Sequence, residues 1–445
     1  MERKPELAPL TDPLDTGERI IIRGGKPLRG KIRVNGAKNS VVALLAAVAL
    51  SEGSILLDNL PMISDAQNML DILEAIGFHT REIVSGCYRL TAQREPLSVT
   101  PDELATRMRA SYYFLGALLG RTGSASVALP GGCKIGARPI DQHLKGFRAL
   151  GATVELDEER GRVTLKAKEL IGTSIYFDIV SVGATVNVML AACRAKGVTV
   201  LENVAREPEI IDVANFLNAM GAQIRGAGTE TIRITGVDYL GGCDYTCLPD
   251  RIEAGTLMMA AAATGGDLLL ENVIPEHLEA VIAKLREMNI GIQHDLDSIH
   301  VDATGIRPQG VMIKTLPYPG YPTDLQPQTT GVLALANGES KVYETLFEQR
   351  FGAVDGLNAM GANITVDGNM AHVIGVPALH GAAVTATDLR CGATLLIAGL
   401  AAQGETQVGC IYHIDRGYNR LVERLTDLGM DMRRISREEA AGMSR

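Results

Sequence analysis

A sequence pattern recurs six times along the chain and constrains its fold more than any other feature. An alanine- and leucine-rich run, a glycine turn and a short alternating stretch precede an amphipathic segment that ends in a motif of the type L-x-x-[M/L/I]-G. Successive copies lie 68 to 74 residues apart and end at Gly77, Gly151, Gly221, Asn289, Gly361 and Gly429. A self-similar period of this length is typical of folds built from repeated supersecondary units.

The content of one repeat can be read from its residues. A second glycine series lies 23 to 28 residues upstream of the first: Gly53, Gly123, Gly197, Gly265, Gly338 and Gly404. In the third repeat, Leu190–Ala195 indicates a helix with Gly197 as its C-cap, Val198–Leu201 a strand, and Glu209–Leu217 an amphipathic helix. We expect two helices and about four strands in each repeat. Because so small a unit cannot bury both of its faces alone, neighbouring repeats must share a core.

Six repeats predict an α/β (α+β) protein of two domains with three repeats each. We expect residues 38–247 to form the first domain, and residues 18–37 with 248–434 to form the second. The stretch Ile20–Val34 reads as strands that precede the first repeat and complete the second domain. Residues 1–17 and 435–445 are expected to be polar terminal segments.

Composition narrows the possible partners and the compartment. The chain has 43 Lys+Arg and 52 Asp+Glu, a net charge of −9, so it has no overall field for nucleic acid or an anionic membrane. Its longest apolar run, Val41–Leu50, is shorter than the ~20 residues of a membrane span, and no secretory signal opens the chain. Seven scattered cysteines favour a reducing compartment, so we expect a cytoplasmic protein. Cys243 and Cys247 lack a second ligand pair, and we expect no structural zinc.

Several short segments could carry chemistry. Lys38 lies in Gly36–Ser40, between a strand and a helix, where it could help to bind an anion or could be an ordinary surface lysine beside a cap. Cys133 lies in a glycine-rich loop near Lys134 and Arg138; neighbouring cations lower the pKa of a thiol, so Cys133 could be a reactive thiol or a buried loop cysteine. Four further charged segments, read singly, predict only structural salt bridges, at Arg109, Asp324, Asp388–Arg390 and Asp415–Arg416.

Read together, these segments resemble one family. The motifs GAKNS (36–40), PGGCKIGARP (130–139), SVGATVNVML (181–190), LPDRIEAGT (248–256), YPTDLQ (321–326) and HIDRGY (413–418) are similar to those of the enolpyruvyl transferases, in the branch that acts on UDP-N-acetylglucosamine. The resemblance runs from about Ile20 to Met432. It implies two inside-out α/β barrel domains, each of three βαβαββ repeats, which agrees with the period found independently.

The resemblance also implies a reaction. Enolpyruvate passes from phosphoenolpyruvate to the 3′-hydroxyl of UDP-N-acetylglucosamine by addition to a tetrahedral ketal and elimination of phosphate, the first committed step of peptidoglycan synthesis. It implies no metal ion or organic cofactor. The two substrates are the expected partners, with no nucleic acid or membrane, and the sequence leaves the oligomeric state open.

Roles for individual residues follow from the same resemblance. Cys133 is the proton donor and the thiol that a fosfomycin-type epoxide alkylates. Asp324 accepts the proton of the sugar hydroxyl, and Asp388 assists it. The cations expected to hold phosphoenolpyruvate are Lys38, with Asn39 beside it, Arg138 and Arg416, and Arg390 adds a further positive charge. The nucleotide-sugar contacts are expected at Arg109, Arg138, Pro139, Ile140, Asp141, Gln142, Ser181, Val182, Gly183 and Leu346.

The chain departs from the family pattern at a few positions that we expect to touch no reacting group: Ile179, Thr329–Thr330, Gly352–Ala353 and Cys391–Gly392. Three alternatives stay open. Transfer to 3-phosphoshikimate is disfavoured by the loop cysteine. A paralogue with altered catalysis is compatible with the departures. A non-enzymatic, repeat-built binding protein is disfavoured because Cys133, Lys38, Asp324 and Arg416 are all present.

Overall fold

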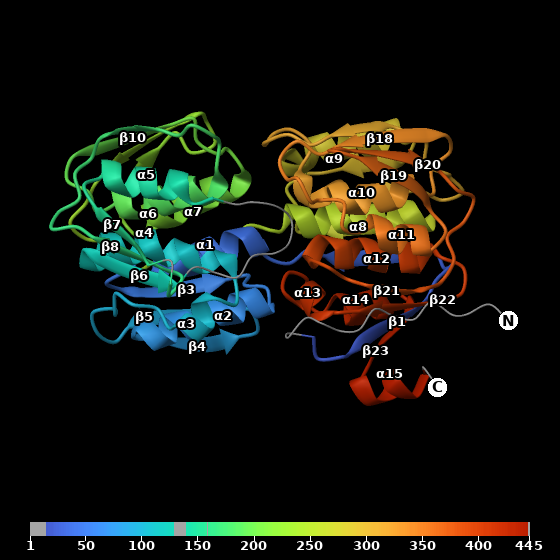
Figure 1. Cartoon of the computed structure of the whole chain (residues 1–445), viewed down its shortest axis with the longest axis horizontal. Coiled ribbons are helices and arrows are strands. Elements are labelled where there is room, and N and C mark those ends of the chain that lie inside the picture. The colour runs from blue at the N-terminus through green and yellow to red at the C-terminus, as the bar shows by residue number, and fades with distance from the viewer. Residues whose placement is uncertain (1–14, 129–138, 158, 444–445) are drawn as a thin grey trace. The chain divides into compact units, whose positions relative to one another are not determined.

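The computed structural model describes residues 15–128, 139–157 and 159–443, and it divides into two compact units (Figure 1). We call the described part of residues 35–249 the first domain, and residues 15–34 together with 250–443 the second domain. The predicted residues Cys133 and Arg138 lie outside the described residues.

The first domain contains three separate sheets. Their strand orders are β13-β3-β5-β4, β6-β8-β7 and β11-β12-β10-β9. The strands are β3 (Ser54–Asp58), β4 (Phe78–Val84), β5 (Cys87–Ala92), β6 (Ser124–Ala128), β7 (Thr153–Asp157), β8 (Arg162–Lys166), β9 (Ser174–Tyr176), β10 (Val198–Glu202), β11 (Gln223–Arg225), β12 (Thr231–Thr235) and β13 (Asp244–Thr246). The helices are α1 (Lys38–Val48), α2 (Ser64–Ile76), α3 (Asp102–Ala105), the 3-10 helix η1 (Arg109–Tyr112), α4 (Tyr113–Thr122), α5 (Asp141–Ala149), α6 (Val182–Ala192) and α7 (Pro208–Ala219).

The second domain contains three four-stranded sheets. Their orders are β15-β16-β14-β2, β17-β18-β20-β19 and β21-β22-β1-β23. The strands are β1 (Arg19–Arg23), β2 (Arg29–Arg33), β14 (Asp267–Glu271), β15 (Gly291–His294), β16 (Ser298–Asp302), β17 (Met312–Lys314), β18 (Glu339–Tyr343), β19 (Asn363–Asp367), β20 (Met370–Ile374), β21 (Ala383–Thr385), β22 (Glu405–Gly409) and β23 (Asp431–Ile435). The helices are α8 (Arg251–Thr264), η2 (Pro275–Leu278), α9 (Glu279–Glu287), η3 (Thr323–Leu325), α10 (Gln326–Leu333), α11 (Val354–Ala359), α12 (Leu389–Ala401), α13 (Tyr412–Asp415), α14 (Leu421–Asp427) and α15 (Arg437–Met443).

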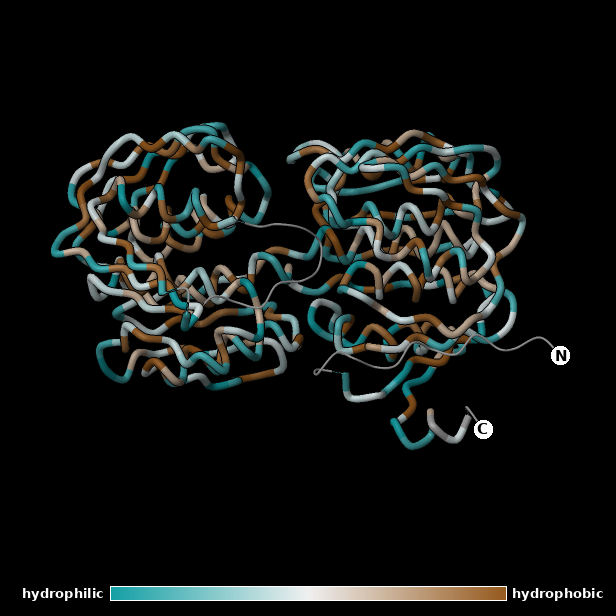
Figure 2. Tube along the Cα trace, viewed as in Figure 1, coloured by the Kyte–Doolittle hydropathy of each residue, from teal (hydrophilic) through white to brown (hydrophobic). Residues whose placement is uncertain are grey.

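Three apolar helices form the centre of each domain: α1, α4 and α6 in the first, and α8, α10 and α12 in the second. Small residues let these helices approach closely, because a Cβ on Gly116 of α4 would lie 2.0 Å from the carbonyl oxygen of Asn187 on α6. The surrounding strands alternate buried and exposed residues, as in β3 and β14, so each sheet turns one face to the core. Figure 2 shows this alternation of hydrophobic and hydrophilic positions along the outer strands.

The repeated glycine positions adopt the backbone conformation that the pattern requires. All six motif ends, including Asn289, have φ between +68° and +117°, a left-handed region that glycine and asparagine tolerate best. One part of the prediction is wrong: α6 ends at Ala192 with Cys193 as its C-cap, and Gly197 instead forms the turn before β10. The sheet of β6, β7 and β8 also has three strands rather than about four.

The N-terminal strands belong to the second domain. β1 lies between β22 and β23 and pairs antiparallel with both, while β2 pairs parallel with β14. Ile20 and Ile22 are completely buried there. Helix α15 covers the other face of this sheet, where Ile21, Ile435 and Ala440 form a small apolar cluster.

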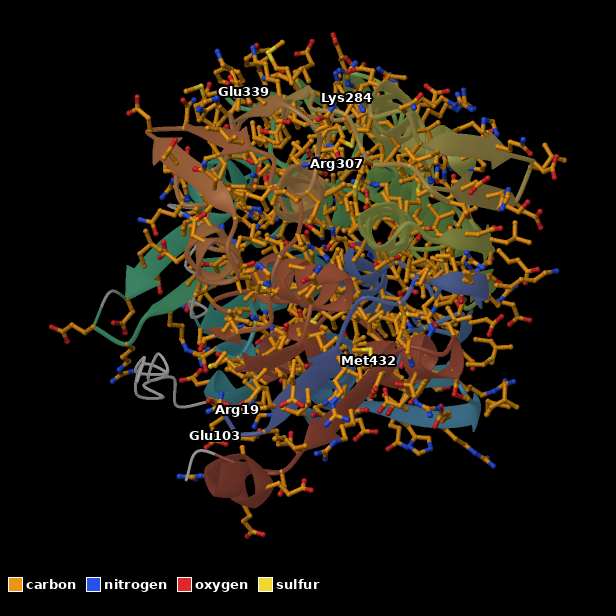
Figure 3. The ribbon with its side chains drawn as sticks, turned by 90° about the vertical axis from the view of Figure 1, so that its right-hand side faces the viewer. Arg19, Glu103, Lys284, Arg307, Glu339 and Met432 are labelled. Atoms are coloured by element: carbon orange, nitrogen blue, oxygen red, sulfur yellow. The ribbon has the colours of Figure 1, made fainter. Side chains whose placement is uncertain are left out.

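Long-range polar contacts join the connecting segments of the second domain. The guanidinium group of Arg307 donates hydrogen bonds to the carbonyl oxygens of Leu335, Ala336 and Val376, which ties the segment after α10 to the segment after β20. Figure 3 labels Arg307 among the side chains of this domain. In the described part of the chain, no helix has both the length and the apolar character needed to cross a bilayer.

Candidate active site

The first turn of α1 carries the predicted phosphate-binding residues of the first domain. The helix begins at Lys38, three residues before the apolar run, so Lys38 and Asn39 both lie in its first turn. Ala37 provides no side-chain cap, and the first turn contains no acidic residue. Lys38 Nζ lies 3.4 Å from the Oδ2 atom of buried Asp65 on α2, and 18% of its side chain is exposed. The helix N-terminus and a fixed cation together provide an environment suited to an anion.

A second group of predicted residues gathers around buried His143. Its Nδ1 atom lies 3.0 Å from Asn187 Nδ2, its ring packs edge-on against Tyr112, and Gly183 leaves room for it. The guanidinium carbon of Arg109 lies 5.3 Å from the centre of the Tyr112 ring. These contacts bring Arg109, the N-terminus of α5 and the N-terminus of α6 into one group.

The protonation state of His143 follows from its surroundings. Burial, together with the positive charge of Arg109, lowers the pKa of His143 to about 4, although Asp141 acts in the opposite direction. Because Asn187 Nδ2 donates to Nδ1, the neutral ring carries its proton on Nε2. His143 is therefore a neutral group that packs behind Gly183 without adding charge.

The N-termini of α5 and α6 are also tied by a polar contact. Ser181 caps α6 by accepting a hydrogen bond from the Ala184 amide. Gln142 accepts the amide proton of Asp178 through Oε1 (2.9 Å) and donates through Nε2 to Asp178 Oδ2 (3.2 Å). Two helix N-termini held close together offer backbone N–H groups that suit a diphosphate. The predicted contacts Pro139–Gln142 and Ser181–Gly183 are thus brought together with Arg109.

The second domain holds Asp324 between two arginines. Its Oδ1 atom lies 2.5 Å from Arg350 Nη2, and its Oδ2 atom lies 3.0 Å from Arg390 Nη2. Both arginine side chains are almost completely buried, whereas 28% of the Asp324 side chain is exposed. Although burial alone would lower it, the pKa of Arg390 is raised because the negative charge of Asp324 dominates. Each carboxylate oxygen therefore has a fixed partner, and the group still reaches solvent.

Asp388 lies next to this ion-pair cluster but has a structural contact of its own. It is the N-cap of α12, and its Oδ1 atom accepts hydrogen bonds from the amides of Arg390 and Cys391. A Cβ on Gly352 would lie 2.9 Å from Thr387 Oγ1 and 3.6 Å from Asp388 Oδ2, and Cys391 Sγ contacts the Gly352 carbonyl oxygen. The expectation that the departures touch no proposed chemical group is therefore wrong for Cys391, whose backbone amide donates to Asp388. Gly352 leaves open the space beside Asp388 that a side chain would enter.

Leu346 and Asp324 are linked through the buried carboxylate of Glu344. Its Oε1 atom accepts the Leu346 amide at 2.9 Å, and its Oε2 atom accepts the hydroxyl of Thr323 at 2.9 Å. Leu346 itself remains 38% exposed. Glu344 therefore fixes the backbone at Leu346 and the side chain of Thr323, the residue before Asp324.

Arg416 lies at the C-cap of α13 and is half-buried. Two residues later, the hydroxyl of buried Tyr418 accepts a hydrogen bond from Arg390 Nη1 at 3.2 Å. The structure thus brings Asp324, Leu346, Asp388, Arg390 and the Arg416 segment together within the second domain.

Four residues of these two groups had no assigned role in the sequence: His143, Glu344, Arg350 and Tyr418. All four are buried, and each also contacts a residue far along the chain: Asn187 for His143, Thr323 for Glu344, Asp324 for Arg350 and Thr256 for Tyr418. Tyr418 ends the motif HIDRGY, but the motif alone assigns it no role. A buried acid such as Glu344 or a buried arginine such as Arg350 can be recognised only when burial is known.

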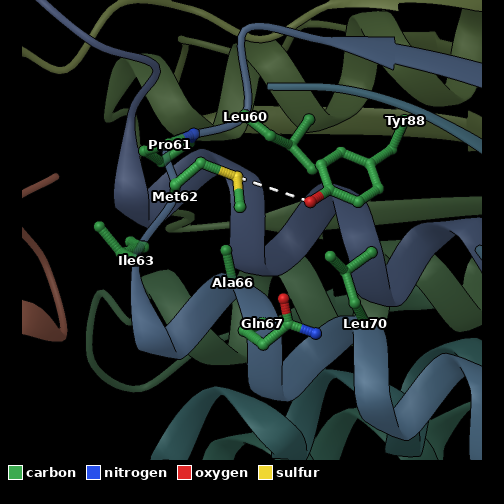
Figure 4. Close-up of a pocket in the computed structure, with 8 residues that line it drawn as sticks. All are labelled: Leu60, Pro61, Met62, Ile63, Ala66, Gln67, Leu70 and Tyr88. Carbon is green, nitrogen blue, oxygen red and sulfur yellow. Dashed lines mark hydrogen bonds between the residues drawn. The ribbon is translucent and has the colours of Figure 1, made fainter. Parts of the chain in front are cut away.

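A small pocket in the first domain has a different character. It lies between the segment 60–63, the first turns of α2 and Tyr88, whose hydroxyl contacts Met62 Sδ at 3.5 Å (Figure 4). Its lining has no charged side chain, so it does not suit an anionic substrate.

Comparison with known proteins identifies the family. The family model described as EPSP synthase (3-phosphoshikimate 1-carboxyvinyltransferase) matches residues 22–425. The UDP-N-acetylglucosamine 1-carboxyvinyltransferase 3 of Caldanaerobacter subterraneus subsp. tengcongensis is 53% identical over 420 residues, which are 94% of this chain and 99% of the relative.

Solved structures agree with this result. The enolpyruvyl transferase NikO from Streptomyces tendae superposes with a TM-score of 0.85 at 28% identity and covers 94% of this chain and 99% of its own. An EPSP synthase from Acinetobacter baumannii shares the fold, with a TM-score of 0.73 at 19% identity over 94% of this chain and 100% of its own. The chain belongs to the enolpyruvyl transferase family, and its similarity over nearly the full length places it with the UDP-N-acetylglucosamine 1-carboxyvinyltransferases.

Proposed function

We propose that the chain transfers the enolpyruvyl group of phosphoenolpyruvate to the 3′-hydroxyl of UDP-N-acetylglucosamine and releases phosphate, which commits the sugar to peptidoglycan synthesis. The observation that carries the proposal is Asp324 in the motif YPTDLQ, with each carboxylate oxygen bound to a buried arginine and the group still exposed to solvent. The paired guanidinium groups favour the ionised carboxylate, which is the form that accepts a proton.

In the addition step, the 3′-oxygen forms a bond to C2 of phosphoenolpyruvate while its proton passes to Asp324. The thiol of Cys133 supplies the proton that C3 gains. In the elimination step, C3 returns a proton to the Cys133 thiolate while the C2–O bond to the phosphate group breaks. The proton held by Asp324 leaves with the phosphate, which yields the enol ether and restores both side chains. A general base for the hydroxyl and a general acid for C3 typically contribute 10²- to 10⁴-fold each.

Binding is assigned to the groups described above. Lys38 and Asn39 on α1, with Arg138 and Arg416, hold the phosphate and carboxylate of phosphoenolpyruvate. The group of Arg109, Pro139–Gln142 and Ser181–Gly183 holds the diphosphate and sugar, and Leu346 contacts the nucleotide. Asp388 positions Asp324 through Arg390, since its side chain fixes the amide of Arg390. Arg390 itself adds positive charge beside Asp324.

The finer architecture is part of the same proposal. Three sheets around three central helices in each domain support two inside-out α/β barrels of three βαβαββ repeats. The division at residues 34–35 and 249–250 supports domains close to the predicted 38–247, and 18–37 with 248–434. The scattered cysteines support the cytoplasm as the working compartment.

A phosphate-release assay tests the function. Full-length protein with phosphoenolpyruvate should release phosphate when UDP-N-acetylglucosamine is added and should not do so with shikimate 3-phosphate. Release with shikimate 3-phosphate alone would assign the other acceptor. No release with either acceptor would indicate the paralogue with altered catalysis or the non-enzymatic binding protein.

A further inference from the structure

The hydroxyl of Tyr418 is shared by three polar side chains in the apolar core of the second domain. Arg390 Nη1 on α12 lies 3.2 Å from it, Thr256 Oγ1 on α8 lies 2.9 Å from it, and Gln328 Nε2 on α10 lies 3.3 Å from it. Only 2% of Tyr418 is exposed, so no bulk water competes for these contacts. The three central helices of the domain therefore meet at one phenol oxygen.

The direction of each hydrogen bond follows from the donors. Thr256 Oγ1 lies 2.7 Å from the carbonyl oxygen of Ile252, so its single proton is donated there. Thr256 must then accept the proton of Tyr418. Guanidinium and amide N–H groups only donate, so Arg390 and Gln328 donate to the Tyr418 oxygen. The result is a series of hydrogen bonds, each donated in the same direction, from Arg390 to Tyr418, from Tyr418 to Thr256 and from Thr256 to a backbone carbonyl oxygen.

This series of hydrogen bonds fixes the guanidinium group of Arg390, which holds Asp324. Arg390 uses Nη1 for Tyr418 and Nη2 for Asp324 Oδ2, and its guanidinium carbon lies 5.7 Å from the centre of the Tyr418 ring. A guanidinium group is planar, so fixing one nitrogen limits where the other can point. The hydroxyl of Tyr418 thereby sets the direction from which Arg390 approaches the carboxylate.

We propose that Tyr418 is a positioning residue for the transfer reaction: through Arg390 it orients the Asp324 carboxylate toward the hydroxyl that loses its proton. The inference rests on the proposed role of Asp324. Without the phenol oxygen, Arg390 keeps a buried N–H donor with no acceptor and turns to find another partner. A misoriented base slows proton transfer but does not weaken substrate binding, so the effect falls on kcat.

The test is Tyr418→Phe in the full-length chain, which removes the oxygen and keeps the ring. We expect kcat for phosphate release to fall about 10-fold, while KM for each substrate stays within about twofold. The matched control is Tyr321→Phe, because Tyr321 is a buried tyrosine of the same domain whose hydroxyl contacts Thr329 instead of Arg390. An unchanged kcat in Tyr418→Phe, or an equal loss in both variants, overturns the proposal.

A second variant keeps the proposal testable if Tyr418→Phe does not fold. Thr256→Val removes the acceptor of the Tyr418 proton and should lower kcat by a smaller factor; an unchanged kcat in this variant alone overturns the proposal. Where Tyr418→Phe folds, the double variant should be no slower than Tyr418→Phe, because Thr256 acts through Tyr418, and effects that multiply would refute the hydrogen-bond chain. An inactive wild-type protein would instead count against the proposed function, whereas an active wild type with an unaffected Tyr418→Phe counts against this inference alone.

Discussion

Asp324 is the residue whose removal should separate chemistry from binding. We expect Asp324→Asn to lower kcat by about 10³-fold, because the amide cannot accept the hydroxyl proton, while binding of phosphoenolpyruvate remains measurable by calorimetry. The amide also leaves Arg350 and Arg390 without a counter-charge, so the melting temperature should be recorded for the same sample. Loss of phosphoenolpyruvate binding in a folded variant would show that the acid is structural.

His143 predicts a defined pH dependence of stability. The unfolded chain binds a proton at this residue near pH 6.5, whereas folded His143 does so only near pH 4. The stabilisation is therefore fully present above pH 6.5 and is lost as the pH falls to 4. The shift corresponds to about 3 kcal/mol of the free energy of unfolding.

Denaturant unfolding of the wild type and of His143→Gln at pH 4 to 7 measures this dependence. The variant should lose less stability on acidification than the wild type does. The control, His380→Gln at an exposed histidine, should follow the wild type. Parallel curves for all three proteins would contradict the assignment of a neutral, buried His143.

At the scale of elements, helix α1 shows how local sequence places a site. The apolar run after Ser40 predicts a helix, but its start at Lys38 depends on the backbone, since the Ala37 amide is bonded to the Leu248 carbonyl oxygen at 2.7 Å.

We expect Lys38→Ala to raise KM for phosphoenolpyruvate more than 10-fold and KM for UDP-N-acetylglucosamine less than threefold. Lys196→Ala removes an exposed lysine paired with Glu169 and should change neither. Equal increases in both KM values would argue against a phosphate site at α1.

The repeats were predictable because each element carries its own signal. Apolar periodicity marks the helices, and a glycine or asparagine with positive φ ends the amphipathic one in all six repeats. The side-chain clusters of the candidate site were not predictable, because they join residues that are far apart in sequence. Tyr418 meets Gln328 across 90 positions and Thr256 across 162 positions. Such contacts depend on how three helices pack, and no local pattern encodes that packing.

At the scale of the whole molecule, the second domain requires strands from both ends of the chain. A fragment of residues 250–445 lacks β1 and β2 and loses the burial of Ile20 and Ile22, each worth about 1.5–3 kcal/mol. We expect this fragment to be unfolded, as measured by circular dichroism. Joining residues 1–34 to it through a short Gly/Ser linker should restore a cooperative melting transition.

Within the described residues, the chain passes between the two domains twice, at residues 34–35 and 249–250, and this allows a short linker. Gly36 and Pro249 form an antiparallel bridge, so the two crossing segments lie side by side where they enter the first domain. A fragment 250–445 that melts cooperatively without residues 1–34 would show that β1 and β2 are dispensable.

The place of β1 also sets an order of events during synthesis. β1 is an inner strand of its sheet, and it leaves the ribosome before its partners β22 and β23. These partners follow about 400 residues later, which at 5–20 residues per second is on the order of 20–80 s. Residues 35–249 are completed within that interval and can fold around their own core. Meanwhile the run Ile20-Ile21-Ile22 has no sheet to join and is exposed to aggregation. The nascent chain therefore depends on delayed pairing, and a chaperone that shields β1 would have its greatest effect in this period.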